Sequence, residues 1–131
     1  MDFCAVVNCM DGRVQLPVIH YLMDRLGVSY VDSITEPGPV KTLSEDPNGP
    51  TSESMLRRVA VSTEGHGSTV VAVVSHADCA GNPAGEQGQR VQLSKSLDLV
   101  GRRFPQVAVL GLWVDDAWTV HEAELREPTS G

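Results

Sequence analysis

The sequence contains no long hydrophobic run and no excess of positive charge. Its longest apolar stretch, residues 69–74, is far too short to cross a bilayer, and no basic segment at the N-terminus leads into a signal-type apolar region. The formal net charge is -7, and an acidic surface argues against nucleic acid or an anionic membrane as the main partner. We therefore expect a cytoplasmic protein that binds neither nucleic acid nor a membrane.

Cysteine is scarce, and internal repeats and low-complexity segments are absent. The three cysteines are Cys4, Cys9 and Cys79. An odd number of cysteines without an export signal argues against a disulfide framework, so reduced thiols are free to bind a metal. Of the 131 residues, 41% are hydrophobic and 21% are charged, which is the composition of a folded protein. We expect a single zinc-binding domain over residues 1–131.

Several segments have the pattern of strands. Residues 3–8 and 69–75 are short runs rich in β-branched residues, as expected for strands that are buried on both faces. Residues 28–34 and 107–114 predict two further strands. Residues 118–123 predict a short edge strand after a tight turn.

Helices are expected between these strands. Apolar residues recur at spacings of three and four over residues 16–26, with Gly27 just past the end, which predicts a helix. A second helix is predicted from an N-cap at Thr51 to about residue 64. A third is predicted over residues 86–104. The residues available for its buried face are Val91, Leu93, Leu97, Leu99 and Val100.

The segment 36–50 contains four prolines and two glycines. This composition predicts a mostly irregular loop. Long loops of this kind in small domains often serve a site or an interface.

The alternation of strands and helices predicts an α/β fold with a mostly parallel sheet of four to five strands flanked by helices. Ligands of such sheets bind beyond the carboxyl ends of the strands. Cys9 lies just past the first strand, and His76 lies just past the third. If these two strands are neighbours, their loops meet at one edge of the sheet.

The residues at these strand ends have the chemistry of a zinc site. His76 and Cys79 are three residues apart in a turn, and Cys9 would add a third ligand from the other strand end. Two thiolates and one imidazole are a typical zinc set, and three protein ligands leave a fourth position open, as in catalytic sites. A structural zinc ion would need a fourth protein ligand. The nearby candidates for that position are Asp11, Asp78 and Cys4.

Asp11 and Arg13 alternate with Cys9 along the chain. Asp11 is close enough to the predicted ligand either to bind the metal or to accept a hydrogen bond from a water on it. Arg13 could hold that carboxylate through a bidentate pair and keep it ionised. We interpret the two residues as a dyad that controls the fourth position.

The pattern Cys9-x-Asp11-x-Arg13, followed by His76-x-x-Cys79, resembles the two signature motifs of the β-class carbonic anhydrases. The resemblance implies that Cys9, His76 and Cys79 bind zinc, with Asp11 and Arg13 as the catalytic dyad. It also implies that the motifs follow the first and third strands of a mostly parallel sheet. The match covers the chain from about residue 3 to the helix after Cys79.

The sequence also departs from this family. The family usually has an Arg-Asn-Ala-Gly-like segment after the second strand, where this chain has the sequence ITEPGP over residues 34–39. The usual glycine after the last cysteine is Ala80 here, with Gly81 one residue later. Typical members also have N-terminal helices that precede the first strand. The chain therefore resembles a short, divergent member.

The resemblance implies the hydration of carbon dioxide to bicarbonate by a zinc-bound hydroxide. Two alternatives stay open: hydrolysis of carbonyl sulfide or carbon disulfide at the same site, or a non-catalytic zinc protein with a binding or structural role. The family places its site at a subunit interface, so we expect a homodimer or higher homo-oligomer. The segment 36–50 and the helix after it are the expected contact regions.

Other residues have simpler interpretations. Cys4 is expected in the core and Asp78 in a turn, where aspartate is common. The three histidines outside the motif are expected to have no direct role, and the two tryptophans are expected in the core or at an interface. These five residues are His20, His66, His121, Trp113 and Trp118.

Overall fold

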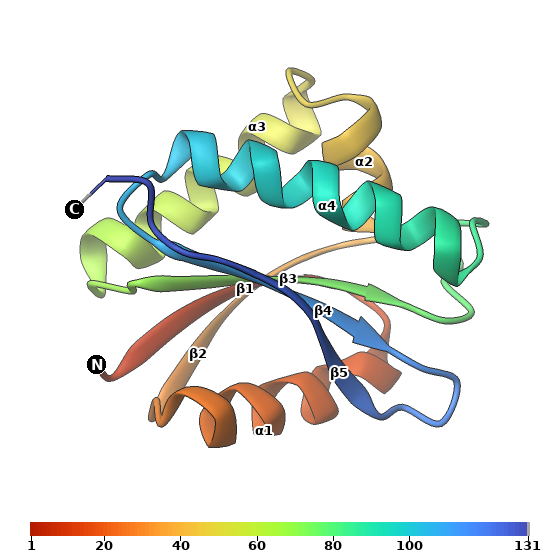
Figure 1. The fold of residues 1–131 in the computed structure, drawn as a ribbon, viewed down its shortest axis with the longest axis horizontal. Coiled ribbons are helices and arrows are strands. Elements are labelled where there is room, and N and C mark those ends of the chain that lie inside the picture. Colours follow the sequence, from red (N-terminus) through yellow and green to blue (C-terminus); the bar gives the residue numbers. More distant parts are fainter. Residues whose placement is uncertain (131) are drawn as a thin grey trace.

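The computed structural model describes residues 1–130 as a five-stranded sheet with helices on both faces (Figure 1). The strands are β1 (Phe3–Cys9), β2 (Tyr30–Glu36), β3 (Val70–His76), β4 (Ala108–Val114) and β5 (Val120–Arg126). Their order in the sheet is β2-β1-β3-β4-β5. The first four strands are mutually parallel, and β5 pairs with β4 in the antiparallel sense. The prediction of an α/β fold with a mostly parallel sheet is confirmed.

The sequence of each strand matches its place in the sheet. The three inner strands β1, β3 and β4 are buried along six of their seven residues, which explains their continuous apolar and β-branched runs. The edge strands β2 and β5 are largely exposed or half-buried and contain several charged residues. Charged side chains on an edge strand oppose unwanted pairing with other chains.

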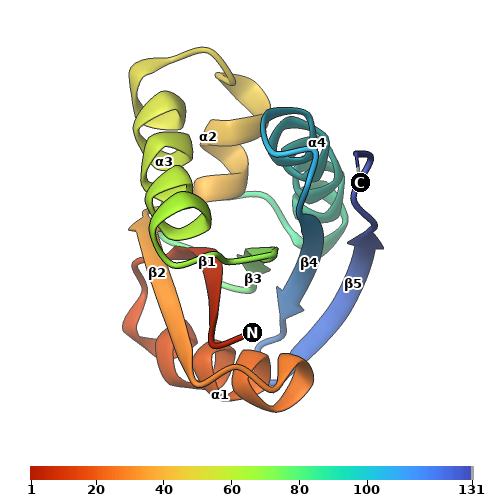
Figure 2. The ribbon, with the colours of Figure 1, turned by 90° about the vertical axis from the view of Figure 1, so that its left-hand side faces the viewer.

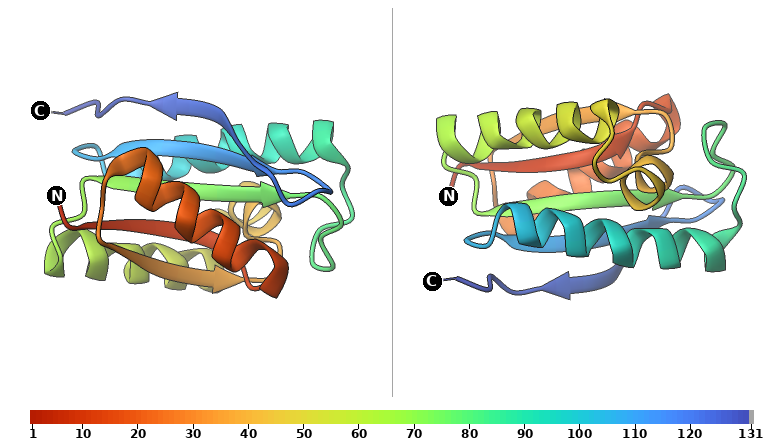
Figure 3. Two further views of the ribbon diagram at one scale, coloured as in Figure 1. Left: turned by 90° about the horizontal axis from the view of Figure 1, so that it is seen from below. Right: turned by 90° about the horizontal axis from the view of Figure 1, so that it is seen from above.

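The helices are divided between the two faces of the sheet. They are α1 (Gln15–Leu26), α2 (Pro39–Glu45), α3 (Pro50–Ala60) and α4 (Glu86–Arg103). Helix α1 covers one face, and the other three cover the opposite face (Figure 2). The two views in Figure 3 show α1 crossing the strands on one side and α2, α3 and α4 on the other. This division follows from the right-handed crossover rule, because the chain moves outward from β1 to β2 and then back across β1 to β3.

The prediction that residues 36–50 form a mostly irregular loop is wrong, because α2 lies within this segment. Gly38 has a left-handed backbone, with a φ of 55°, and Pro39 occupies the first turn of the helix. Proline is tolerated there because the first helical N–H groups have no intrahelical partner. Val40 and Leu43 are buried in the core. Burial of this apolar pair therefore outweighs the helix-breaking composition of the flanking residues.

The start of α3 also differs from the prediction. Gly49 is the N-cap and Pro50 is the first helical residue, so Thr51 is not the cap. After Ala60 the chain continues in a short π-helical turn, Val61–Gly65. The helical segment thus ends near the predicted position, but through a wider turn than a regular α-helix.

Helix α4 has the predicted length, but its buried face is partly polar. Leu93, Leu97 and Val100 are buried as expected, whereas Val91 is 55% exposed. Gln89 and Ser96 are buried in their place. Gln89, Leu93, Leu97 and Val100 follow one another at spacings of four, four and three, so Gln89 continues the apolar stripe of the helix.

Two hydrophobic clusters lie on the two faces of the sheet. The cluster under α1 includes Leu22, Val6 and Leu110, and the cluster under the other helices includes Met55, Val73 and Leu97. Cys4 is fully buried in the α1 cluster, as expected for a core residue. Among the helices of residues 1–130, none combines the length and apolar composition that a membrane crossing requires.

Candidate metal centre

The candidate site lies where the sheet reverses its strand order. Strands β1 and β3 are parallel neighbours, although β2 and three α-helices separate them in the sequence. Strand β1 ends at Cys9 and β3 ends at His76. Their carboxyl ends therefore open at the same edge, which is the usual ligand position in open α/β sheets.

Cys9, His76 and Cys79 converge at this edge. Their ligand atoms all lie within 4.8 Å of one another. The Cys9 and Cys79 sulfurs are 3.8 Å apart, far beyond the roughly 2.05 Å of a disulfide bond. Two sulfurs bound tetrahedrally to one zinc ion with bonds of about 2.3 Å would be about 3.8 Å apart. The spacing of the thiols therefore fits a shared metal ion.

The His76 side chain is oriented for the same role. Its Nδ1 donates a hydrogen bond to the Ala77 carbonyl oxygen at 2.7 Å. The other ring nitrogen, Nε2, is buried and has no hydrogen-bond partner among the described residues. A backbone carbonyl that holds one nitrogen and leaves the second with a free lone pair is a typical arrangement for a metal-ligating histidine. A metal ion bound to Nε2 would offset the free-energy cost of burying this nitrogen without a partner.

The main chain of His76 is held by Gln89 from α4. The Gln89 side chain accepts from the His76 N–H at 3.2 Å and donates to the His76 carbonyl oxygen at 2.9 Å. It also donates to the Ala84 carbonyl oxygen at 3.0 Å. Gln89 was not among the site residues predicted from the sequence. In the sequence, the only indication of its burial was its position in phase with the apolar stripe of α4.

The protein environment favours the thiolate form of one cysteine. Burial raises the pKa of Cys9, but the His76 imidazole and the backbone N–H groups of Gly38 and Asp11 outweigh it and lower the pKa to about 7. Burial and the adjacent Cys9 sulfur raise the pKa of Cys79, although the N–H groups of Gly81 and Asn82 oppose this effect. A bound divalent cation would favour both thiolates.

The loops that carry these N–H groups pack closely against each other at two glycines, Gly38 and Gly81. A Cβ atom on Gly38 would lie 2.6 Å from the Gly81 carbonyl oxygen, and one on Gly81 would lie 2.8 Å from the Pro37 carbonyl carbon. The loop after β2 thus packs backbone against backbone on the loop that carries Cys79. The ITEPGP sequence, which departs from the family pattern, supplies this contact through Gly38.

Asp11 and Arg13 form an ion pair beside the candidate metal centre. The Arg13 Nη2 donates to Asp11 Oδ2 at 2.7 Å, and its Nε donates to both carboxylate oxygens at 3.1 and 3.2 Å. The Arg13 side-chain hydrogen bonds hold the pKa of Asp11 at about 2. The carboxylate is not part of the group of atoms placed to share a metal ion. Asp11 is therefore ionised and paired with Arg13 rather than placed as a fourth ligand.

The turn between Asp11 and α1 is fixed by Gln15, a second residue that was not among the predicted site residues. Its side-chain nitrogen donates to the Cys9 carbonyl oxygen at 2.6 Å and to the Asp11 carbonyl oxygen at 3.3 Å. The residue lies in the first turn of α1, four positions after Asp11, where its side chain can reach back over the loop. Its position immediately before the predicted helix was the only feature of the sequence that indicated this role.

The remaining histidines lie outside the cluster. His66 pairs with Asp32 and His121 pairs with Asp115, each at 2.7 Å. His20 is exposed on α1. Asp78 occupies a turn in the left-handed conformation, with a φ of 56°. It also forms an ion pair with Arg13 at 3.1 Å, which the turn interpretation did not anticipate.

The fold and the site define the class of protein: an α/β protein with a candidate metal centre of two cysteines and one histidine at the switch point of its sheet. A sequence model of the family described as "Putative carbonic anhydrase" matches residues 1–124. The chain belongs to this carbonic anhydrase family.

The solved structures include a similar fold. The β-carbonic anhydrase CafA of the fungal pathogen Aspergillus fumigatus aligns with a TM-score of 0.61 at 12% sequence identity, covering 92% of this chain and 74% of that chain. At 12% sequence identity, this similarity shows a shared fold and nothing more. The search of curated proteins found no match.

Proposed function

We propose that the protein is a zinc-dependent carbonic anhydrase that hydrates carbon dioxide to bicarbonate. The observation that carries the proposal is the convergence of the Cys9, His76 and Cys79 donor atoms, together with a buried His76 Nε2 that has no hydrogen-bond partner within residues 1–130. Two soft sulfurs and one imidazole suit zinc, and oxygen-preferring cations such as Mg²⁺ do not favour this set. Membership of the family supports the reaction class.

Cys9, His76 and Cys79 would hold the zinc ion and leave one coordination position for water or substrate. A zinc ion held there would act as a Lewis acid and would supply a water-derived nucleophile at neutral pH. Asp11 would orient the reacting water by accepting a hydrogen bond from it. A carboxylate with a pKa of about 2 remains an acceptor throughout the neutral range.

Arg13 would keep Asp11 in this role. The guanidinium binds both carboxylate oxygens, so it fixes the orientation of the carboxylate and opposes its movement onto the metal. Proton release would use solvent or a nearby base.

We also propose that the protein is a homodimer with its site near the subunit contact. Met10 and Leu16 are 61% and 64% exposed on either side of the Asp11–Arg13 turn. A second chain that covers them would wall the reaction pocket with apolar surface. Light scattering tests this: a monomer mass at micromolar concentration would contradict it, and replacing both residues with glutamine should weaken a dimer.

The proposed activity is tested by metal analysis of the purified protein, its Cys9→Ser and Cys79→Ser variants, and Cys4→Ala as the matched control. We expect about one zinc per chain in the wild type and in Cys4→Ala, and much less in the other two. Assays of carbon dioxide hydration and carbonyl sulfide hydrolysis then identify the substrate. A zinc-loaded protein inactive toward carbon dioxide would refute the proposal, and activity toward carbonyl sulfide alone would assign that reaction instead.

A further inference from the structure

The Arg13 side chain is held from three directions. Besides its contacts with Asp11, its Nη1 donates to Asp78 Oδ2 at 3.1 Å, and its Nη2 donates to the Asp78 carbonyl oxygen at 3.0 Å. The guanidinium carbon also lies 4.4 Å from the ring centre of Trp118, over the ring. Two edges of the guanidinium are therefore occupied by aspartates, and one flat face is covered by an indole.

The two residues that hold Arg13 from outside the dyad share a backbone feature. Asp78 and Trp118 have φ values of 56° and 62°, and within residues 1–130 they are the only non-glycine residues with positive φ. This conformation is unfavourable for a residue with a Cβ atom, most of all for a bulky one, and it persists only where the surroundings impose it. Both of these residues contact the same guanidinium.

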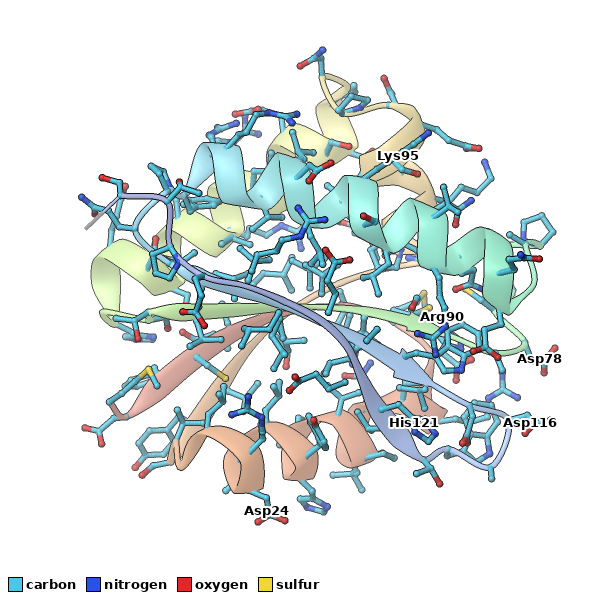
Figure 4. The ribbon with its side chains drawn as sticks, viewed as in Figure 1. Asp24, Asp78, Arg90, Lys95, Asp116 and His121 are labelled. Atoms are coloured by element: carbon cyan, nitrogen blue, oxygen red, sulfur yellow. The ribbon has the colours of Figure 1, made fainter. Side chains whose placement is uncertain are left out.

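The turn between β4 and β5 imposes this conformation on Trp118. The Asp115 carboxylate accepts from the N–H groups of Ala117 and Thr119 at 2.9 and 3.0 Å, and the Trp118 N–H donates to the Asp115 carbonyl oxygen at 3.0 Å. The carboxylate also pairs with His121 at 2.7 Å. In Figure 4, Asp116 of this turn and Asp78 lie at the same end of the molecule, and His121 lies on the strand that leaves the turn. The hairpin thus presents the indole to the motif loops.

We propose that Trp118 is a positioning residue that, together with Asp78, holds Arg13 in the orientation in which it binds Asp11. The catalytic consequence rests on the proposed function, whereas the positioning itself does not. An ion pair on an exposed arginine is weak and mobile by itself, and the Arg13 side chain is 45% exposed. The indole excludes water from one face of the guanidinium and restricts its rotation, so the hydrogen bonds to Asp11 persist for longer.

The positioning is tested first by NMR of the Arg13 Nε–H group, the donor to Asp11. In the wild type its resonance should be shifted by the ring current of Trp118 and protected from exchange with water. Trp118→Leu should remove the ring-current shift and speed exchange about two- to fivefold, the effect expected of an exposed cation–π contact. Tyr30→Leu, a matched change of an exposed aromatic residue, should alter neither. An unshifted wild-type resonance, or unchanged exchange in Trp118→Leu, would overturn the proposal.

The catalytic consequence is tested by a double-mutant cycle in the zinc-loaded protein. Trp118→Leu should lower kcat/KM about two- to fivefold, and Trp118→Phe, which keeps an aromatic face, should restore most of it. In an Arg13→Leu background, Trp118→Leu should have no further effect. A full additional loss there would show that Trp118 does not act through Arg13. If the NMR results hold but no variant hydrates carbon dioxide, the proposed function fails and the positioning stands.

Discussion

Gly38 and Gly81 approach so closely that neither can carry a side chain: a Cβ atom on Gly38 would lie 2.6 Å from the Gly81 carbonyl oxygen. Gly38 has a left-handed backbone, and its N–H group helps to lower the pKa of Cys9, whose burial raises it. The N–H group of Gly81 has the corresponding effect on Cys79. The contact therefore couples the loop after β2 to both sulfurs of the candidate metal centre.

Gly38→Ala should destabilise the protein and weaken its hold on zinc. The left-handed conformation costs about 1–2 kcal/mol for a residue with a Cβ atom, and the overlap with a backbone atom adds about 1–3 kcal/mol because no side-chain rotation relieves it. Urea unfolding and competitive metal titration measure the two effects. Gly27 has a φ of 70° and open space where a Cβ atom would lie. Gly27→Ala should therefore show only the cost of the left-handed backbone conformation. Equal losses in the two variants would contradict the role of the Gly81 contact.

Arg13→Lys should lower activity without lowering zinc content. Lysine keeps the charge, but a single ammonium group cannot bind both carboxylate oxygens and Asp78 at once. Changes to groups that orient a metal site typically cost about 10- to 100-fold in activity or affinity, and we expect kcat/KM to fall about tenfold. Steady-state kinetics beside zinc analysis checks this. A variant as active as the wild type would show that the bidentate pair is not needed.

Gln89→Leu should destabilise the metal-free protein by about 1–3 kcal/mol, because the N–H and carbonyl groups of His76 lose their buried partners. Gln87→Leu is the matched control, since Gln87 is exposed on the same helix. Chemical denaturation of the two variants measures the difference. If both variants were equally stable, the contacts of Gln89 would contribute nothing to the fold.

The two valines of α4 should respond differently to truncation. Val100→Ala should cost about 1.5–3 kcal/mol of unfolding free energy, because Val100 is fully buried. Val91→Ala should change it by less than about 0.5 kcal/mol, because Val91 is 55% exposed. Thermal or urea unfolding distinguishes them, and the reverse order would mean that the helix presents the other face to the sheet.

Asp115→Asn should lower stability in a pH-dependent way. The hydrogen bond with His121, and those from the Thr119 and Ala117 N–H groups, lower the pKa of Asp115. A carboxyl group with a lowered folded-state pKa contributes stability above its unfolded pKa, and this contribution is lost as the pH falls through the folded-state value. The melting temperatures of wild type and variant should therefore differ fully above about pH 4 and converge below it. A constant difference down to pH 2 would show that these hydrogen bonds to the ionised carboxylate do not stabilise the fold.

Much of the fold could be predicted from local patterns. The inner strands are apolar on both faces, and α1 shows regular spacing with Gly27 at its end, so their positions followed from the sequence. Helix α2 could not be predicted in this way, because seven residues between prolines carry little helical signal. Its stability comes from the contacts of Val40 and Leu43 with the core, and these contacts exist only in the folded protein.

The sequence by itself determined the chemistry of the candidate site: the identity and spacing of Cys9, Asp11, Arg13, His76 and Cys79 favour a metal centre with an adjacent acid–base pair. The tertiary structure decided which other residues support it. Gly38, Trp118 and Gln89 reach the site from the loop after β2, the β4–β5 turn and α4, at 29 to 109 residues from Cys9 along the chain. The physical reason is that metal-ligand types and short spacings are local properties of a sequence, whereas close packing between distant segments depends on the whole fold.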